Sequence, residues 1–329
     1  MPIAIAGSIA TDHLMSFSGR FADSLVVDQL DKISVSFLAH KLEIRRGGVA
    51  ANIAFGMGNL GQRPVLVGSV GQDFADYRSW LERHGVDCDS VRTSETQHTA
   101  RFVCTTDDDM AQIATFYAGA MSEAREIELA PIAERVGGLD LVLVGPDDPD
   151  AMRRHTQECR DRGIPFVADP SQQLAFGGGD LIRDLIDGAE YLITNEYESH
   201  LTAQKTGWSQ DEIDSRVGYR VTTLGKDGVR ITGKDLDEPI HVAAAREVTK
   251  ADPTGVGDAF RAGFLTGIAE GLPLRESAEL GSMLATYVIE TVGTQEYEVG
   301  TARFLERLTQ AYGAESAGLI ADHIHCRRP

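Results

Sequence analysis

Short apolar runs alternate with amphipathic segments along the middle of the chain. The apolar runs predict buried strands at residues 141–145, 165–169, 191–194 and 219–225. The segments between them predict helices, at residues 149–162, 180–187 and 195–205. The apolar start, residues 1–7, predicts a further buried strand. Because strands that alternate with helices form parallel sheets covered on both faces, we expect a three-layer α/β/α fold with a mostly parallel central sheet.

The two ends of the chain depart from this alternation. After Val256 the pattern predicts three helices, at residues 257–271, 273–292 and 300–312, followed by a C-terminal tail, 313–329. Toward the N-terminus, two stretches rich in Val, Ile, Thr and Phe predict hairpins, at residues 33–45 and 91–117. We therefore expect one domain over residues 1–329. Its small antiparallel β-sheet would project as a lid formed by insertions at about 12–46 and 91–118.

Composition narrows the class of protein. Hydrophobic residues make up 42% of the 329 residues, which is enough for one large core. The net charge of −19 argues against nucleic acid or an anionic membrane as a partner. No apolar run has membrane length, and the start does not read as a signal peptide. The cysteines are scattered, as in reduced cytoplasmic proteins: Cys88, Cys104, Cys159 and Cys326. A zinc site in the tail, at His323, His325 and Cys326, is a weaker alternative to a frayed end.

The segment Asp252–Phe260, with the sequence DPTGVGDAF, carries the strongest chemical signal. Its two glycines let the backbone curl just before a predicted helix, so that several N–H groups and the helix dipole face one spot. This geometry suits an anion, and Asp258 beside it suits a base next to a phosphate that is being transferred. The alternative is an ordinary helix start with an acidic first turn.

Two further segments follow predicted strands or open helices. Gly48 and Asn52 are four residues apart at a helix start, where a backbone N–H and an amide side chain could reach a polyhydroxyl ligand. Ser8 and Asp12 follow the first strand, at the edge where ligands bind in parallel sheets, and Asp12 could accept hydrogen bonds from two sugar hydroxyls. A plain tight turn before a core helix is the alternative for the Gly48 segment.

Phe102 and Phe116 flank a turn signal, Asp107–Asp109. A hairpin centred on Asp109 places the two rings opposite each other on one face, where they could stack on a planar base. A cross-strand core pair is the alternative.

Two further segments could bind a nucleotide, but each also has a purely structural interpretation. Asn195 and Glu198 could hold Mg²⁺ through water, or they could simply cap a helix. The turn 223–228 could meet the phosphates of a nucleotide through its backbone and Lys226, or it could be an ordinary hairpin turn.

Taken together, these segments resemble the ribokinase-like (PfkB) family of sugar and nucleoside kinases, from residue 3 to about 310. The signatures are the Gly47–Asn52 helix start and the Asp252–Phe260 segment. Within the family, the likeness is strongest to adenosine kinases of the actinobacterial type. It rests on four stretches: 7–13, 100–102, 110–114 and 169–173.

The resemblance implies an enzyme that transfers the γ-phosphate of ATP to the 5′-hydroxyl of adenosine. Asp258 then corresponds to the catalytic base, and Gly255, Val256 and Gly257 to the anion hole. Residues matching nucleoside contacts are Ser8, Asp12, Gly48, Asn52, Phe102, Phe116, Gln172 and Gln173. Residues matching the ATP side are Asn195, Thr223, Gly225, Lys226 and Gly228. Asn195 and Glu198 match the Mg²⁺ motif, Asp252 matches a site for a monovalent cation such as K⁺, and a homodimer through the small sheet is expected.

Two expectations about mechanism accompany the resemblance. The dipole of the helix that begins near Asp258 is expected to keep this carboxylate ionised and therefore weakly basic. Closure of the lid is expected to exclude water.

Three other functions stay open. The first is a family kinase for another nucleoside or for a free sugar, such as inosine, guanosine, ribose or fructose. The paired Phe rings would favour a nucleoside, because a pure sugar needs hydroxyl partners rather than two flat rings. The second is a non-catalytic nucleoside-binding protein on the same scaffold, which the presence of Asp258 and both loop glycines disfavours. The third is an NAD-dependent oxidoreductase, which the absence of the Gly-x-Gly-x-x-Gly fingerprint for dinucleotide binding disfavours.

Overall fold

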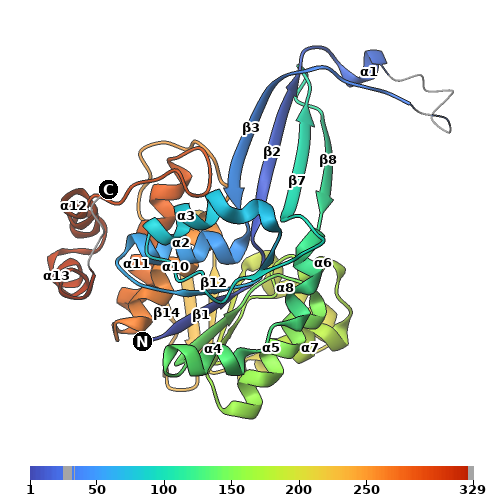
Figure 1. The fold of residues 1–329 in the computed structure, drawn as a ribbon. Coiled ribbons are helices and arrows are strands. Elements are labelled where there is room, and N and C mark those ends of the chain that lie inside the picture. The colour runs from blue at the N-terminus through green and yellow to red at the C-terminus, as the bar shows by residue number, and fades with distance from the viewer. Residues whose placement is uncertain (25–31, 33, 325–329) are drawn as a thin grey trace.

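The computed structural model describes residues 1–24, 32 and 34–324 (Figure 1). An eight-stranded sheet forms its centre, in the order β14-β13-β12-β11-β10-β9-β1-β4, and a four-stranded sheet has the order β3-β2-β7-β8. The strands are β1 (Ile3–Ala6), β2 (Ala10–Phe17), β3 (Ala39–Gly47), β4 (Val65–Val67), β5 (Ser69–Val70), β6 (Arg92–Thr93), β7 (Ala100–Thr106), β8 (Gln112–Tyr117), β9 (Leu141–Val144), β10 (Phe166–Ala168), β11 (Tyr191–Asn195), β12 (Tyr219–Thr223), β13 (Val229–Gly233) and β14 (Ile240–Val242). The six strands from β12 to β4 run parallel, and β13 and β14 complete the sheet antiparallel.

Helices cover both faces of the central sheet. The helices of the main body are α2 (Val49–Asn59), α3 (Ala75–Arg83), α4 (Leu129–Val136), α5 (Pro149–Arg162), α6 (Gln173–Phe176), α7 (Gly179–Ile186), α8 (Glu196–Thr206), α9 (Gln210–Arg216), α10 (Val256–Ala269), α11 (Leu274–Ile289), α12 (Thr301–Tyr312) and α13 (Ala314–His323). The short helix α1 (Phe21–Ser24) lies instead at the far end of the four-stranded sheet (Figure 1). Within the described residues, no helix is both long and apolar enough to span a membrane.

Alternating side chains of each strand build two separate cores. Ile3 and Ile5 of β1 pack into the core that α2, α3 and α10–α13 cover, whereas Ala4 and Ala6 pack into the core of α4, α5 and α7. This is the pattern of a parallel strand that is buried on both faces. The predicted three-layer α/β/α fold is confirmed, and α5 has the predicted bounds, Pro149–Arg162.

The small sheet projects from the main body (Figure 1). It consists of two antiparallel hairpins, β2–β3 and β7–β8, which join through the parallel pair β2·β7. The expectation of a hairpin within residues 33–45 was wrong, because β3 begins only at Ala39 and pairs with β2, for which the sequence pattern predicts no strand. Part of that predicted hairpin, Ile33, lies outside the described residues.

The C-terminal segment is also a correction. Residues 314–323 form α13, and Ala317, Ile320 and Ile324 are buried against the core on the α12 side. A frayed tail was predicted because short helices with few large apolar residues give a weak periodic signal. The zinc alternative cannot be placed, since His325 and Cys326 lie outside the described residues. Cys88, Cys104 and Cys159 are buried free thiols.

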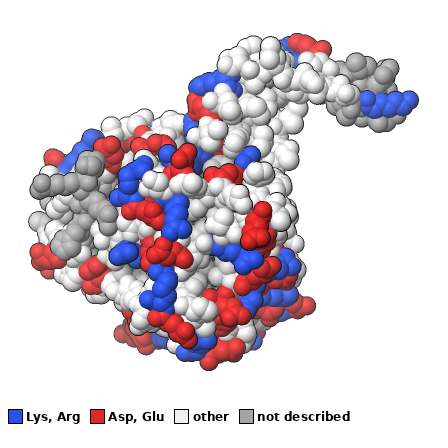
Figure 2. Space-filling model, in the orientation of Figure 1, with Lys and Arg blue, Asp and Glu red and all other residues white. Residues whose placement is uncertain are grey.

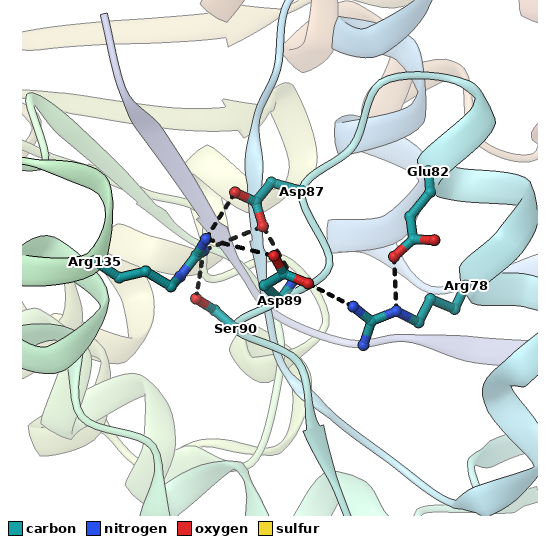
Figure 3. Close-up of polar contacts among 6 residues, drawn as sticks. All are labelled: Arg78, Glu82, Asp87, Asp89, Ser90 and Arg135. Carbon is teal, nitrogen blue, oxygen red and sulfur yellow. Dashed lines mark hydrogen bonds and ion pairs between the residues drawn. The ribbon is translucent and has the colours of Figure 1, made fainter.

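A cluster of ion pairs closes the β4 edge of the sheet (Figure 3). Arg135 on α4 donates to both carboxylate oxygens of Asp87, at 2.9 and 3.1 Å, and to Ser90 Oγ at 2.8 Å. Arg78 on α3 donates to Asp89 at 2.6 Å and to Glu82 at 2.7 Å. Burial alone raises the pKa of Asp87, but Arg135 and the Asp89 amide outweigh it, so the net pKa lies below its usual value. The cluster thus ties helices from opposite faces of the sheet together.

We expect Arg135→Ala to lower the free energy of unfolding by about 1 kcal/mol, because a two-point guanidinium contact to a mostly buried carboxylate is lost. The difference should be present above pH about 4 and disappear as Asp87 becomes protonated at lower pH. Urea unfolding at several pH values measures it. Arg153→Ala, which breaks the exposed pair with Asp184, is the control and should change little. An equal loss in both variants would contradict the assignment.

Candidate active site

The predicted site residues gather along one edge of the central sheet. This edge carries the carboxyl ends of the parallel strands, which is where ligands bind in sheets of this kind. Following the strand order, Thr223 ends β12, Asn195 ends β11, Asp169 follows β10, and Ser8 comes two residues after β1. Asn195 and Thr223 are direct neighbours across the β11–β12 ladder.

The start of α10 has the geometry of an anion site. Gly255 is its N-cap, with φ 79° and ψ 0°, and a Cβ there would lie 2.8 Å from Thr294 Cγ2. Only glycine fits both the left-handed backbone and this close contact. Within the described residues, the N–H groups of Gly257 and Asp258 make no hydrogen bond and α10 has no side-chain cap. Unpaired N–H groups at a helix start attract an anion.

A buried polar network holds Asp258 in place. Asn52 on α2 donates from Nδ2 to Asp258 Oδ2 at 2.8 Å. The other end of the same amide, Oδ1, accepts from Thr294 Oγ1 at 3.0 Å and from Gln295 Nε2 at 2.9 Å. Asn52 itself is only 6% exposed. The amide is therefore fixed in one orientation, and Asp258 has no ion-pair partner among the described residues.

Burial raises the pKa of Asp258 to about 6, against the lowering by Asn52 and Arg261. The expectation that this carboxyl is ionised at neutral pH agrees with this value, whereas the expectation that it is only weakly basic does not. Loss of solvation outweighs the favourable contacts, since a charged form loses more on burial than the neutral form does. A carboxyl with this pKa is still ionised at neutral pH, and it is a better proton acceptor than an exposed aspartate.

The residues at the start of α2 lie beside β1. Gly48 has φ 94°, and a Cβ at this position would come within 2.6 Å of Ser8 O and Ala10 N. Ser8 Oγ accepts from Val49 N at 3.0 Å, and Ser8 O accepts from Ala50 N at 3.1 Å. Ser8 thus caps α2, and it retains its hydroxyl proton for a further contact. The close packing explains why the glycine is required here.

One face of the small sheet carries a row of four side chains. Arg45, Asp12, Phe102 and Phe116 are successive cross-strand neighbours on β3, β2, β7 and β8. The predicted pairing of Phe102 with Phe116 is confirmed. Phe116 is 54% exposed, so the alternative of a cross-strand core pair does not hold. Because paired residues share a face, the two rings lie on the same side as Asp12, whose pKa burial raises against the effect of Arg45.

The same row faces the loop before α10. Arg45 Nη1 lies 3.7 Å from Asp252 Oδ2, and Asp252 accepts from the N–H groups of Thr254 and Gly293 at 2.9 and 3.2 Å. These contacts hold the pKa of Asp252 below its usual value, although burial alone would raise it. The face of the small sheet that carries the two rings is therefore the face that contacts the loop before α10.

The glutamines at residues 172 and 173 follow Asp169. Gln173 donates from Nε2 to Asp147 O at 2.9 Å, and Gln172 is exposed. Asp147 is itself buried, and burial raises its pKa to about 8. The segment thus lies beside the loop after β9, between β10 and β1 in the sheet order.

Asn195 and Glu198 form a reciprocal helix cap. Asn195 Oδ1 accepts from Glu198 N, and Glu198 Oε2 accepts from Asn195 N, both at 2.8 Å. The structural alternative is thus realised. Glu198 Oε1 makes no hydrogen bond within the described part of the chain, so it is available to a hydrated cation, and an amide and a carboxylate suit Mg²⁺ that keeps its water. No group of three His, Cys, Asp or Glu side chains among the described residues forms a direct metal site.

The turn after β12 is the tight hairpin that the structural alternative predicted. Leu224 N donates to Gly228 O at 2.7 Å, and β13 returns antiparallel beside β12. Gly225 and Gly228 have positive φ, and a Cβ on Gly228 would lie 2.0 Å from Val242 O. Lys226 is exposed beside the edge that carries Asn195. The backbone of this turn and the side chain of Lys226 therefore lie at the same edge of the central sheet as the other candidate site residues.

Sequence reasoning missed several residues that hold the site. Thr294 and Gln295 fix Asn52 from a loop more than 240 positions away, and no local motif marks them. Arg261 on α10 is buried against Asp169. A usable signal existed for Arg261, because it is the one charge in the apolar stretch 259–269.

Known proteins resemble this chain over most of its length. Residues 21–299 match the model of the pfkB family carbohydrate kinases. A nucleoside kinase of Methanothermobacter thermautotrophicus is 29% identical over 293 residues, which span 88% of this chain and 93% of that protein. The ligand-free structure of Burkholderia thailandensis nucleoside kinase is 36% identical, has a TM-score of 0.84 and spans 93% of this chain and 99% of the other. The same kinase in complex with ADP-inosine is 36% identical, with a TM-score of 0.79 over 95% and 96% of the two chains.

The family model covers both segments that carried the resemblance, Gly47–Asn52 and Asp252–Phe260. The structural neighbours share the three-layer fold with its small separate sheet. The chain therefore belongs to the PfkB family of carbohydrate kinases.

Proposed function

We propose that the protein is an adenosine kinase, which transfers the γ-phosphate of ATP to the 5′-hydroxyl of adenosine and gives AMP and ADP. The observation that carries the proposal is the hydrogen bond between Asn52 and Asp258 beside the unpaired N–H groups of α10. This contact supports the roles proposed for Asp258 as proton acceptor and for the N–H groups of α10 as the site of the transferring phosphoryl group. The choice of adenosine rests on the four segments that resemble adenosine kinases, among them 100–102 and 169–173.

In the proposed reaction, the N–H groups of Gly257 and Asp258 bind the γ-phosphate at the start of α10. The adenosine 5′-oxygen lies between this phosphate and the Asp258 carboxylate, which accepts the hydroxyl proton as the oxygen attacks phosphorus. The bond from phosphorus to the β,γ-bridging oxygen breaks, and ADP leaves. Phosphoryl transfer depends mainly on positioning and on charge stabilisation, which the backbone donors supply without reorganisation.

The nucleoside is proposed to lie on the Asp12 face of the small sheet. Asp12, Ser8, Gly48 and Asn52 offer hydrogen-bond partners for the ribose, and Phe102 and Phe116 offer flat surfaces for the base. Gln172 and Gln173 line the neighbouring loop. The small sheet then acts as a lid, whose closure keeps water from the phosphate.

ATP is proposed to extend along the same edge toward β12, with its phosphates near Asn195 and the turn that contains Thr223, Gly225, Lys226 and Gly228. Mg²⁺ bound with the nucleotide would neutralise phosphate charge, held through water by Asn195 and Glu198. A monovalent cation such as K⁺ at Asp252 remains a proposal, and Arg45 and two backbone N–H groups already supply positive partners to this carboxylate.

A homodimer through the small sheet is also proposed. The face opposite to Asp12 exposes Leu42, Ile44, Ile113 and Tyr117, at 55%, 61%, 46% and 40%. Figure 2 shows few charged residues along the projecting sheet on the face that is in view. Many Lys, Arg, Asp and Glu residues of both signs are scattered over the main body on the same face. An exposed apolar face of this kind is typical of a protein–protein interface. Light scattering of the purified protein tests the mass.

A kinase for another nucleoside is the second candidate. The Burkholderia thailandensis kinase, at 36% identity, was solved with ADP-inosine. A panel of adenosine, inosine, guanosine, ribose and fructose with MgATP, followed by ADP release, separates the candidates. The highest kcat/KM for adenosine supports the proposal, and a higher value for inosine or guanosine assigns the enzyme to that nucleoside instead.

We expect Asp258→Asn to lower kcat by about 10²–10⁴-fold, because the amide cannot accept the proton. Nucleoside binding, measured by calorimetry, should be largely kept. Glu270→Gln at the other end of α10 is the control and should retain activity. More than a tenth of the wild-type kcat in Asp258→Asn would remove the assigned role.

The pH dependence follows from the pKa of Asp258, about 6. The base must be ionised, so kcat/KM should be constant above pH 7 and fall about tenfold for each unit below 6. Initial rates from pH 5 to 8 measure this acid limb, which is the fall of kcat/KM at low pH. Circular dichroism at the same pH values verifies folding. A constant kcat/KM down to pH 5 would contradict the role of Asp258 as base.

Phe102→Ala and Phe116→Ala should each weaken nucleoside binding by roughly 1–3 kcal/mol and leave ATP binding nearly unchanged, because the lost contact is base stacking. Calorimetry with each ligand gives the two values. Ile113→Ala removes an apolar side chain from the opposite face of β8 and is the matched control. If nucleoside affinity is unchanged in both Phe variants, the rings do not bind the base.

A further inference from the structure

A buried ion pair lies directly behind the proposed base. Arg261 on α10 contacts both carboxylate oxygens of Asp169, with Nε 2.5 Å from Oδ2 and Nη2 2.6 Å from Oδ1. The two side chains are 8% and 0% exposed. A pair this deeply buried is costly to form, and well-packed apolar residues would often serve stability as well. Its presence at this position therefore calls for a role other than stability.

Arg261 also fastens the first turn of α10. Its third contact runs from Nη1 to Gly257 O, at 3.1 Å. Gly257 belongs to the proposed anion hole, and Asp258 is three residues before Arg261, on the same face of the helix. One guanidinium thus holds the backbone that carries the unpaired N–H groups, and its charge lies next to the base.

Asp169 connects this charge to the nucleoside side of the site. It directly follows β10 and precedes the segment that carries Gln172 and Gln173. Burial raises the pKa of Asp169, and the contact of both its oxygens with Arg261 acts in the opposite direction. The pair therefore joins the phosphate-side loop to the nucleoside-side loop through one rigid contact.

The charges that act on Asp258 are few. Besides Asn52, which is neutral, they are Arg261, which lowers its pKa, and Asp169, which raises it. The charge of Asp258 in turn raises the pKa of Tyr297, and the charge of Glu198 raises the pKa values of Asp169 and Arg261. The helix α11, which packs along α10, buries the titratable side chains of Glu279 and Tyr287, but neither of them acts on the pKa of Asp258.

We propose that the Arg261–Asp169 pair is a positioning unit for phosphoryl transfer: Arg261 holds the anion-hole backbone through Gly257 and sets the charge that faces Asp258, and Asp169 fixes Arg261 and partly balances that charge. This inference rests on the proposed role of Asp258. A purely structural pair would stabilise the fold without setting the ionisation of the base.

Single substitutions of the two partners give opposite results if the proposal holds. In Arg261→Met the positive charge is lost, and the acid limb of kcat/KM moves to higher pH by about one unit. In Asp169→Asn the balancing negative charge is lost, and the limb moves to lower pH. Both variants lower kcat more than they raise KM for ATP, because the N–H groups at Gly257 are no longer held. Shifts in the same direction, or no shift in either variant, overturn the proposal.

Two controls separate these effects from a general loss of stability. Arg261→Lys keeps the charge but not the three-point contact, so its acid limb stays in place while kcat falls. Asp87→Asn and Arg135→Met break the ion pair of Figure 3, far from α10, and should lower Tm without moving the acid limb. If Arg261→Met fails to fold, the comparison of Asp169→Asn with Asp169→Asn/Arg261→Gln replaces it, and the limb of the double variant should lie about one unit higher.

The rates are measured with whichever nucleoside the wild-type enzyme phosphorylates best. If it phosphorylates none, the proposed function fails, and the inference is tested without activity. The carboxyl carbon of Asp258 is then titrated by ¹³C NMR, with Asp258→Asn for assignment. Opposite movement of its pKa in Arg261→Met and Asp169→Asn supports the inference, and its absence refutes it.

Discussion

The hydrogen bond from Asn52 to Asp258 joins two helices that begin at the same edge of the sheet. It connects residues 206 positions apart and requires that α2 and α10 start close together with their first turns side by side. Each start depends on a glycine, Gly48 against Ser8 O and Gly255 against Thr294, where a Cβ would lie under 3 Å from its neighbour. The sheet order provides the frame, since β1 leads into the small sheet and its return into α2. The position of Asp258, the proposed base, is thus a consequence of backbone packing more than of any side chain near it.

The sequence was sufficient to predict the central sheet and the helices that cover it, because the signals for these elements are local. Parallel strands buried on both faces give continuous apolar runs, and α5 was bounded by an Asp N-cap, a Pro at the first position and a Gly at its end. β2 could not be predicted in the same way. It is partly buried along its length, and its residues, Ala10–Phe17, mix charged, polar and apolar side chains without strict alternation. Its pairing with β3 and β7 is set by tertiary context.

Some residues of the candidate site were likewise predictable from the sequence, and others were not. Asp258, Gly255 and the pairing of Phe102 with Phe116 were predictable, because a helix start and a turn fix them within a few residues. Thr294, Gln295 and the Arg261–Asp169 contact were not, since each joins segments distant in sequence. The same limit explains why Asp258 is more basic than expected. A helix start favours the charged form, but burial, which only the packed structure determines, raises the pKa of this carboxyl to about 6.

A chain with a net charge of −19 that binds ATP as proposed would have to hold a polyanion against its own field. The structure meets this requirement locally. The donors at the anion site are backbone N–H groups, which carry partial positive charge without adding counter-charges, and the nearest cation, Arg261, is neutralised in part by Asp169. A full, unbalanced cation at this point would hold the base strongly acidic, whereas a full carboxylate alone would repel phosphate. Burial raises the pKa of Asp258 to about 6, so the carboxyl is ionised at neutral pH yet able to accept a proton, which is the condition that a base beside a phosphate has to satisfy.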